Sequence, residues 1–314
     1  MAEIVGAFAL SHAAVMVRHW EQATAADQAA VRGAFDEIAR RLRAARADAL
    51  LIVGNDHYRS FFLDQMPAFC LGIGDTSIGC GDGGFPPHAL PVASQLADGL
   101  LEGLLARQFD LAFAHNLPLD HAFIGPMHNL FGGAGLPIVP LFQNCVAPPL
   151  PPLARYLALG AAIAEVLAQI EPGLRVALLG TGGLSHEVPL PDWRRLPQDA
   201  EGEHWLRFMT AGRSGADAKT LERIGAEVDR WGRERRGRID ETFDRELLAW
   251  MQAGDYARFA DLDAETLRRR GGNGAQEVRN WVTVMGAVPG TRAELLVYAP
   301  VPAWLTGVAA VEFR

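Results

Sequence analysis

The sequence has few cysteines and no run of residues with charge of one sign. Each of these features argues against a class of protein. Its three cysteines, Cys70, Cys80 and Cys145, form no C-x-x-C pair, and an odd number does not suit a disulfide framework. We therefore expect the protein to reside in a reducing cytoplasm. The net charge of −8 argues against a surface that binds nucleic acid.

Long apolar runs are absent as well. No stretch approaches the roughly 20 apolar residues that cross a bilayer, and Glu3 stands where a signal peptide has cationic residues. We expect neither membrane insertion nor secretion, and no membrane partner.

Apolar segments alternate with helical patterns along the chain. Hydrophobic residues make up 49% of the 314 positions, which is ample for a buried core. Strands are predicted at residues 4–10, 50–53, 111–115, 137–142, 176–180 and, as the last one, 295–298. Helices are predicted at 24–47, 92–108, 120–131, 153–170 and 275–287. The alternation indicates an α/β fold with a central, largely parallel or mixed sheet covered by helices.

We predict one α/β catalytic domain over residues 1–314. Its C-terminal half carries a helical extension at about 199–270, where the helical pattern is dense in charge. The Gly/Pro-rich passage at 72–91 predicts no regular structure. With His88 inside it, the passage suits either the wall or lid of a pocket or a long surface loop.

Three predicted strands each lead into a histidine: His12, His57 and His186. Ligands of open α/β sheets bind beyond the carboxyl ends of the strands. His12 and His57 with one carboxylate would form the two-histidine, one-carboxylate face that holds non-haem Fe(II). A histidine at a strand end is also often a plain hydrogen-bonding residue. The pattern leaves three carboxylates open, namely Asp244, Glu246 and Glu277, and the last could equally complement a helix dipole.

His121 and His186 are candidates for proton transfer, because histidine titrates near neutral pH. Asp120 could polarise a histidine or cap the helix that follows it. The glycines at 180–183 leave backbone amides free to approach a ligand, which is a weak indication of an anion site without the lysine of a P-loop.

Six motifs in the same order resemble the class III extradiol ring-cleavage dioxygenases, from about residue 8 to residue 306. They are Leu10-Ser11-His12, Asn55-Asp56-His57-Tyr58 with Phe61-Phe62, Met66-Pro67-Ala68-Phe69-Cys70-Leu71-Gly72, Leu119-Asp120-His121-Ala122-Phe123, Gly182-Gly183-Leu184-Ser185-His186 and Glu277-Val278-Arg279-Asn280-Trp281. Six motifs in register are far more specific than any one of them.

The resemblance implies a role for each matching residue. His12 and His57 match the iron-binding histidines, and Glu277 matches the carboxylate ligand. His186 matches the histidine that handles a proton of the catechol or of oxygen. His121 matches the second acid/base histidine, and Asp120 stands beside it as in the relatives.

The implied activity is Fe(II)-dependent opening of a catechol-type ring with O2, giving a hydroxymuconic semialdehyde-type product in aromatic catabolism. A 3-substituted catechol such as 2,3-dihydroxyphenylpropionate is the expected substrate, with Arg59 or Arg18 as candidates to bind its carboxylate. A dihydroxypyridine, an aminophenol or another catechol stays open, because residues 192–238 depart most from the relatives. Relatives also lead us to expect a homo-oligomer.

The sequence also leaves open two functions that differ in class from a dioxygenase. A zinc-dependent hydrolase or lyase could use the same two histidines with a metal-bound water. A non-catalytic binding protein could retain the fold without the metal.

Overall fold

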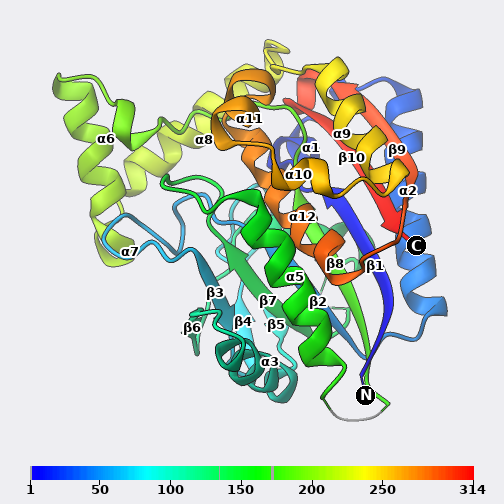
Figure 1. The fold of residues 1–314 in the computed structure, drawn as a ribbon. Helices are drawn as coiled ribbons and strands as arrows, with labels where there is room; N and C mark the ends of the chain where they lie inside the picture. The colour runs from blue at the N-terminus through cyan, green and yellow to red at the C-terminus, as the bar shows by residue number, and fades with distance from the viewer. Residues whose placement is uncertain (1, 134, 171–172) are drawn as a thin grey trace.

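The computed structural model describes residues 2–133, 135–170 and 173–314 and is built on one large sheet (Figure 1). The sheet has eight strands in the order β6-β3-β7-β2-β8-β1-β10-β9. These strands are β1 (Glu3–Ser11), β2 (Ala49–Gly54), β3 (Phe69–Gly72), β6 (Ala112–Ala114), β7 (Ile138–Gln143), β8 (Arg175–Gly182), β9 (Ala293–Val301) and β10 (Thr306–Phe313).

The centre of the sheet is parallel and its flanks are mixed. Strands β7, β2, β8 and β1 run in one direction, whereas β10 is antiparallel to β1 and to β9, and β3 is antiparallel to β7. At one edge, β6 pairs in parallel with β3. The predicted α/β fold with a largely parallel or mixed sheet is therefore confirmed, in its mixed form.

Helices cover both faces of the sheet. They are α1 (Ala14–Arg18), α2 (Ala25–Ala44), α3 (Ser94–Ala106), α4 (His121–Phe131), α5 (Leu153–Leu167), α6 (Ala200–Thr210), α7 (Gly212–Gly215), α8 (Ala218–Arg233), α9 (Glu241–Ala253), α10 (Ala257–Ala260), α11 (Ala264–Gly271) and α12 (Val278–Ala287). Short 3₁₀ turns are η1 (Trp20–Gln22), η2 (Trp193–Arg195), η3 (Gly274–Glu277) and η4 (Pro302–Trp304).

Successive residues of each central strand point to opposite faces, so two cores form. In β2, Leu50 and Ile52 belong to the core that includes residues of α2 and α4, whereas Leu51 and Val53 belong to the core that includes residues of α3, α5, α9 and α12. Both faces of the central strands are buried, which explains why β2 and β8 read as continuous apolar runs in the sequence.

The stretch predicted as a helical extension is helical, and it contains α6 to α11. Its first helix is attached close to His57, because Phe208 and Met209 of α6 pack with Tyr58 and Phe62 of the loop after β2. Across the described ranges, no helix combines the length and the apolar character needed to cross a bilayer.

The structure corrects the strand predictions in three places, the first of which is β3, a strand that was not predicted. The strand at 295–298 is not the last, because β10 follows it; Gly307 and two adjacent alanines disfavour a strand by propensity, yet β10 pairs on both sides with β1 and β9. The passage at 72–91 is not free of regular structure. It contains the antiparallel ribbon of β4 (Thr76–Ile78) and β5 (Ala89–Pro91), which are too short to be read from a pattern.

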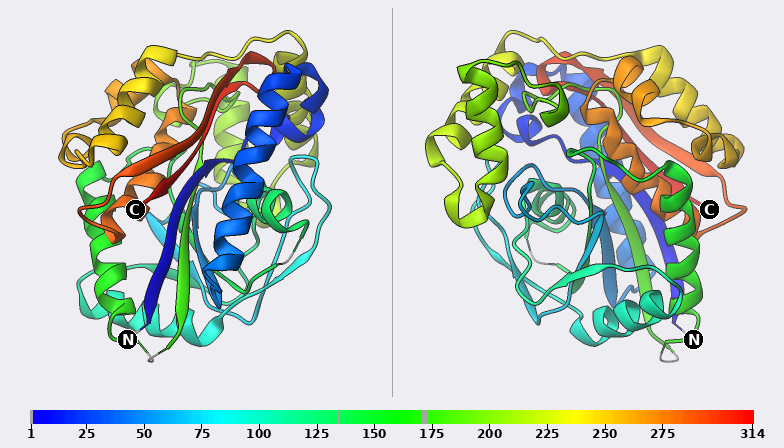
Figure 2. Two further views of the ribbon diagram at one scale, coloured as in Figure 1. Left: turned by 90° about the vertical axis from the view of Figure 1, so that its right-hand side faces the viewer. Right: turned by 60° about the vertical axis from the view of Figure 1, so that its left-hand side comes forward.

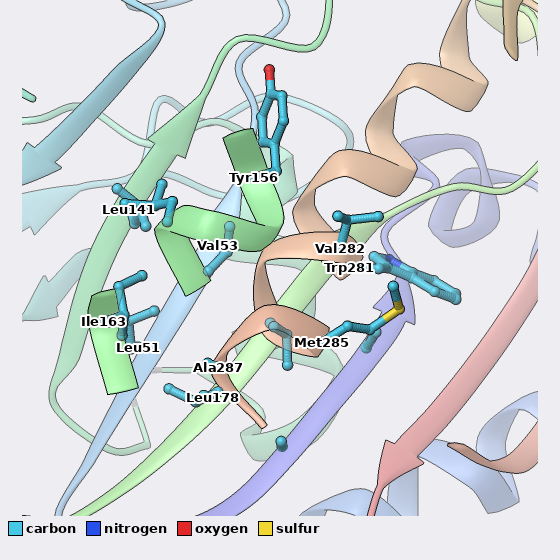
Figure 3. Packing of buried hydrophobic residues seen from close by; sticks show 14 of the residues in the cluster. Leu51, Val53, Leu141, Tyr156, Ile163, Leu178, Trp281, Val282, Met285 and Ala287 are labelled. Carbon is cyan, nitrogen blue, oxygen red and sulfur yellow. The ribbon is translucent and has the colours of Figure 1, made fainter. Parts of the chain in front are cut away.

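Helices α5 and α12 cross in close contact over the sheet (Figure 3). A Cβ at Gly160 would overlap the carbonyl oxygen of Thr283, and one at Gly286 would overlap that of Leu157. The two glycines therefore let the backbones approach. Because Glu277 immediately precedes α12, this crossing also fixes where that carboxylate lies.

We predict that Gly160→Ala destabilises the protein by about 2–3 kcal/mol, because the added methyl group cannot fit against α12 without moving a backbone. The matched control is Gly33→Ala on the exposed side of α2, where an added Cβ meets nothing within 4 Å. That change should stabilise by up to about 1 kcal/mol through helix propensity. Denaturant unfolding measures both, and an equal stability of the two variants would contradict the packing described here.

Candidate metal centre

Three histidines lie at one edge of the sheet because they follow parallel neighbouring strands. His12 follows β1, His57 lies three residues beyond β2, and His186 lies four residues beyond β8. Since β8 stands between β1 and β2 in the sheet, the carboxyl ends of these strands open into one space. The predicted convergence of the three strand ends is seen in the structure.

The Glu277 carboxylate lies among these histidines. Its oxygens are 3.4 Å from Nε2 of His12, 3.0 Å from Nε2 of His57 and 3.6 Å from Nε2 of His186. Asn55 donates to the same carboxylate over 3.2 Å. Glu277 and His12 are almost wholly buried, so the carboxylate has these groups and little water around it.

Two glycines of β8 let Glu277 approach the sheet. A Cβ at Gly182 would lie 2.8 Å from the carbonyl oxygen of Glu277, and one at Gly180 would lie 2.9 Å from that of Asn280. Asn280 in turn donates to the Thr181 carbonyl over 2.8 Å. The sequence suggested an anion-binding backbone here. In the structure, these two glycines accommodate the start of α12 instead.

Asp120 orients His57 rather than its neighbour His121. Its Oδ2 accepts from Nδ1 of His57 over 2.7 Å and from the His57 amide over 3.0 Å, but lies 3.9 Å from Nδ1 of His121. Its other oxygen caps α4 by accepting from the Ala122 amide. Asp120 therefore caps the helix, and the histidine in hydrogen-bonding contact with it is His57 rather than His121.

The electrostatics of the cluster shift the pKa values of His12 and His57 in opposite directions. Burial lowers the pKa of His12 despite the nearby Glu277. Burial also opposes charge on His57, but Asp120 and Glu277 together raise its pKa well above the ordinary value. Burial disfavours an ionised Glu277 too, yet the histidines around it lower its pKa well below the ordinary value. The carboxylate is thus ionised, and His12 presents a neutral imidazole.

His121 lies against this cluster from the start of α4. Its ring stacks on that of His57 with 4.4 Å between centroids, and its Nδ1 is 2.7 Å from Oδ2 of Asp82. One nitrogen from each of His12, His57 and His121 falls within 4.8 Å of the others. A second group with this spacing comprises Asp82, Asp120 and His121.

A glycine-rich turn holds His186 in place. Its Nδ1 lies 2.9 Å from the Leu184 carbonyl, which can only accept, so Nδ1 carries the hydrogen and Nε2 faces Glu277. A Cβ at Gly274 would overlap this ring, and one at Gly272, where φ is +88°, would overlap the His186 carbonyl. The run at 271–274, which broke the helical pattern in the sequence, therefore wraps this histidine.

The other two candidate carboxylates lie away from the cluster. Asp244 is buried and accepts from the amide and the hydroxyl of Ser185 over 2.8 Å each; burial raises its pKa to about 6 even though these donors lower it. Glu246 is half-buried and paired with Arg270 at 2.7 Å. Of the three, Glu277 alone stands beside His12 and His57.

A cavity opens in front of the histidines. It is lined by His12, His57, His121, His186 and Glu277, by Arg18, Arg59 and Asp82, and by apolar side chains from α1, α8 and the C-terminal segment. Both arginines proposed from the sequence thus reach it. His88 does not line the cavity, whereas Asp82 and Gly83 of the same passage do, so part of that passage is a pocket wall.

Sequence reasoning missed three residues of this site. Asn55 was visible as a polar residue that directly follows a buried strand, two positions before His57. Asn280 stands one helical turn after Glu277 and donates to Asn55 over 3.0 Å. Asp82 had no sequence signal, because it lies in an irregular passage and reaches His121 only through the fold.

The residues present fit a divalent metal. His12, His57 and Glu277 offer two imidazoles and a carboxylate, the donors typical of non-haem Fe(II). Nδ1 of His12 is buried without a hydrogen-bond partner. The contact from Asp120 to His57 is the outer-shell carboxylate that usually orients a metal-binding histidine. The ligand set is thus chemically suitable. Its least constrained member is His12, because no hydrogen bond from the described residues orients its ring through Nδ1.

We predict that Asp120→Asn lowers metal affinity about 10- to 100-fold, because His57 loses the charged acceptor that orients it. Asp82→Asn is the matched control, since Asp82 accepts from His121 instead. Competition with a chelator measures both affinities. Equal losses in the two variants would contradict a specific role of Asp120 behind His57.

Comparisons with known proteins find a matching sequence family and a solved structure of similar fold. The sequence model of the family described as "Catalytic LigB subunit of aromatic ring-opening dioxygenase" matches residues 6–309. An Escherichia coli K12 protein of solved structure and uncharacterised function shares the fold, with a TM-score of 0.50 and 14% identity over 90% of this chain and 92% of that one.

Curated relatives carry the name 2,3-dihydroxyphenylpropionate/2,3-dihydroxicinnamic acid 1,2-dioxygenase. One from Burkholderia vietnamiensis is 32% identical and covers 88% of this chain and 90% of its own. One from Klebsiella pneumoniae is 30% identical with 90% of each chain covered. One from Escherichia coli K12 is 31% identical over 90% of this chain and 91% of its own. The chain therefore belongs to the LigB family of aromatic ring-opening dioxygenases, and the extradiol resemblance predicted from its motifs is confirmed.

Proposed function

We propose that this LigB-family protein is an Fe(II)-dependent extradiol dioxygenase that opens a catechol ring with substitution at position 3. The observation that supports the proposal is the contact of the Glu277 carboxylate with both strand-end histidines, with 3.4 Å from Nε2 of His12 and 3.0 Å from Nε2 of His57 to its two oxygens. Two imidazoles and one carboxylate are the donor set that holds non-haem Fe(II) while leaving positions open for substrate.

His12, His57 and Glu277 would hold the iron. When bound, ferrous iron supplies a Lewis acid that lowers the pKa of catechol hydroxyls and open positions for substrate and O2. The protein orients its donors before metal arrives. Asp120 fixes Nδ1 of His57 at 2.7 Å, and Asn55 holds one oxygen of Glu277 at 3.2 Å.

His186 is suited to accept a proton from the substrate. Its Nδ1 hydrogen is committed to the Leu184 carbonyl, so the Nε2 lone pair faces the cavity beside Glu277. A base in this position can take a hydroxyl proton as a catechol binds.

His121 is suited to be the second acid/base group. Its Nδ1 lies 2.7 Å from Asp82, and its ring is held against His57, so Nε2 is the nitrogen left for exchange with substrate. His186 and His121 approach the cavity from different elements, which allows one to accept and the other to donate a proton.

The substrate class follows from the relatives. Their names specify 2,3-dihydroxyphenylpropionate, a catechol with a substituent at position 3. We extend this substitution pattern to the present chain, with a dihydroxypyridine or an aminophenol as the nearest chemical alternatives. We also propose one catalytic domain over residues 1–314, a cytoplasmic location and assembly into a homo-oligomer.

Oxygen uptake tests this function directly. We predict that protein reconstituted anaerobically with Fe(II) consumes O2 and forms a yellow ring-opened product when a 3-substituted catechol is added. His12→Ala should reduce turnover at least about 1,000-fold, because it removes a metal donor that no neighbour replaces.

Two outcomes would count against the proposal. One is the absence of oxygen uptake with fully ferrous protein across catechols, hydroxypyridines and aminophenols. The other is zinc as the metal of natively purified protein together with an activity that survives without oxygen. Glu246→Gln is the control, because it removes a carboxylate that is paired with Arg270 outside the cavity.

A further inference from the structure

Helix α8 lines the cavity and contacts neighbouring elements at both of its ends. At its C-terminal end, Asp229 accepts from Arg18 of α1 over 2.7 Å, and Gly232 is buried against α1 and η4. At its N-terminal end, Thr220 lies 3.1 Å from His204 of α6. Figures 1 and 2 show α6 to α8 at the end of the molecule away from the N-terminus, the end toward which β1 runs.

One face of α8 is apolar and turned to the histidines. Leu221, Ile224 and Val228 follow the spacing of one helix face, and all three line the same cavity as His12 and His186. None of the three is fully buried. Leu221 and Ile224 pack on one side against the cluster of Tyr58, Phe62, Phe208 and Met209, and all three side chains also face the cavity in front of the histidines.

Gly225 leaves room in this apolar face. It also lines the cavity, and a Cβ built on it meets nothing within 4 Å. Position 225 lies one turn after Leu221 and three residues before Val228, so a side chain there would project between them into the cavity. The glycine therefore makes a recess in the helix face opposite the metal ligands.

The charged groups that line the cavity include Arg18, Arg59, Asp82 and Glu187, and these four have partners of opposite charge, with Glu187 3.1 Å from Arg238. Arg18 is bound to Asp229 at 2.7 Å, and Arg59 lies 3.5 Å from Asp82 beside His121. The wall formed by Leu221, Ile224 and Val228 itself carries no charge. An apolar group placed against it would bury hydrocarbon surface, which is stabilising by about 25 cal/mol per Å².

We infer that the apolar face of α8 binds the ring-3 substituent of the catechol, that this substituent is an alkyl or aryl group, and that Gly225 provides the space for it. The inference rests on the proposed extradiol function and adds the substituent class. It assigns α8, which lies within the 192–238 region that departs most from relatives, to substrate selection rather than to chemistry.

The test compares three substrates on Fe(II)-loaded protein: catechol, 3-phenylcatechol and 2,3-dihydroxyphenylpropionate. The wild type should prefer 3-phenylcatechol in kcat/KM. In Gly225→Val, kcat/KM for 3-phenylcatechol should fall about 10- to 100-fold, whereas that for catechol should change less than about twofold, because the added isopropyl group excludes only the larger ligand. Anaerobic calorimetry should show the same loss in affinity without turnover.

Ala226→Val is the matched control. It adds a branched side chain to the exposed side of the same helix, outside the cavity, and should leave the ratio of the two kcat/KM values unchanged. A reduced ratio in this control would attribute the effect to α8 stability rather than to the recess, and would overturn the inference.

The remaining outcomes distinguish a failure of the α8 assignment from a failure of the proposed dioxygenase function. If the wild type opens catechols but Gly225→Val lowers kcat/KM equally for all three substrates, the assignment of α8 to substrate selection fails and the proposed dioxygenase function stands. If 2,3-dihydroxyphenylpropionate is preferred and Arg59→Gln abolishes that preference, the substituent is anionic and the inference is wrong. If no catechol is bound or turned over, the proposed function fails together with it.

Discussion

The contact of the Glu277 carboxylate with His12 and His57 is the interaction on which the rest of the structure depends. A buried carboxylate is costly unless it has charged or hydrogen-bonding partners, and here imidazoles and Asn55 supply them. The cluster brings together groups that a divalent cation binds once His57 gives up its proton. Metal binding at this site is therefore coupled to protonation.

The fold separates chemistry from substrate selection. The parallel strands β1, β2 and β8 present histidines at one edge, and the crossing of α5 and α12 at Gly160 and Gly286 fixes the carboxylate opposite them. These elements belong to the rigid core. The apolar wall comes from α8, a helix of the charge-rich segment that follows the last parallel strand β8. Such an arrangement allows the substituent pocket to differ between relatives while the ligand geometry stays the same.

The parts of this site that the sequence predicts are those encoded locally. Continuous apolar runs reveal buried strands, and His12, His57 and His186 are visible because they follow such runs. The selection of Glu277 over Asp244 and Glu246 required family resemblance, since all three lie on helices with ordinary surface patterns. The contacts from Asp82 to His121 and from Asp120 to His57 depend on the fold alone, and β10 was missed because its small residues disguise a strand that tertiary pairing stabilises.

The most direct test of the central claim is a crystal structure of the anaerobic, Fe(II)-loaded protein with anomalous scattering recorded at the iron edge. We predict one anomalous peak within about 2.0–2.3 Å of Nε2 of His12, Nε2 of His57 and an oxygen of Glu277. A peak among Asp82, Asp120 and His121, or one held by His12, His57 and His121 without Glu277, would contradict the account, since each of these groups also has metal-like spacing.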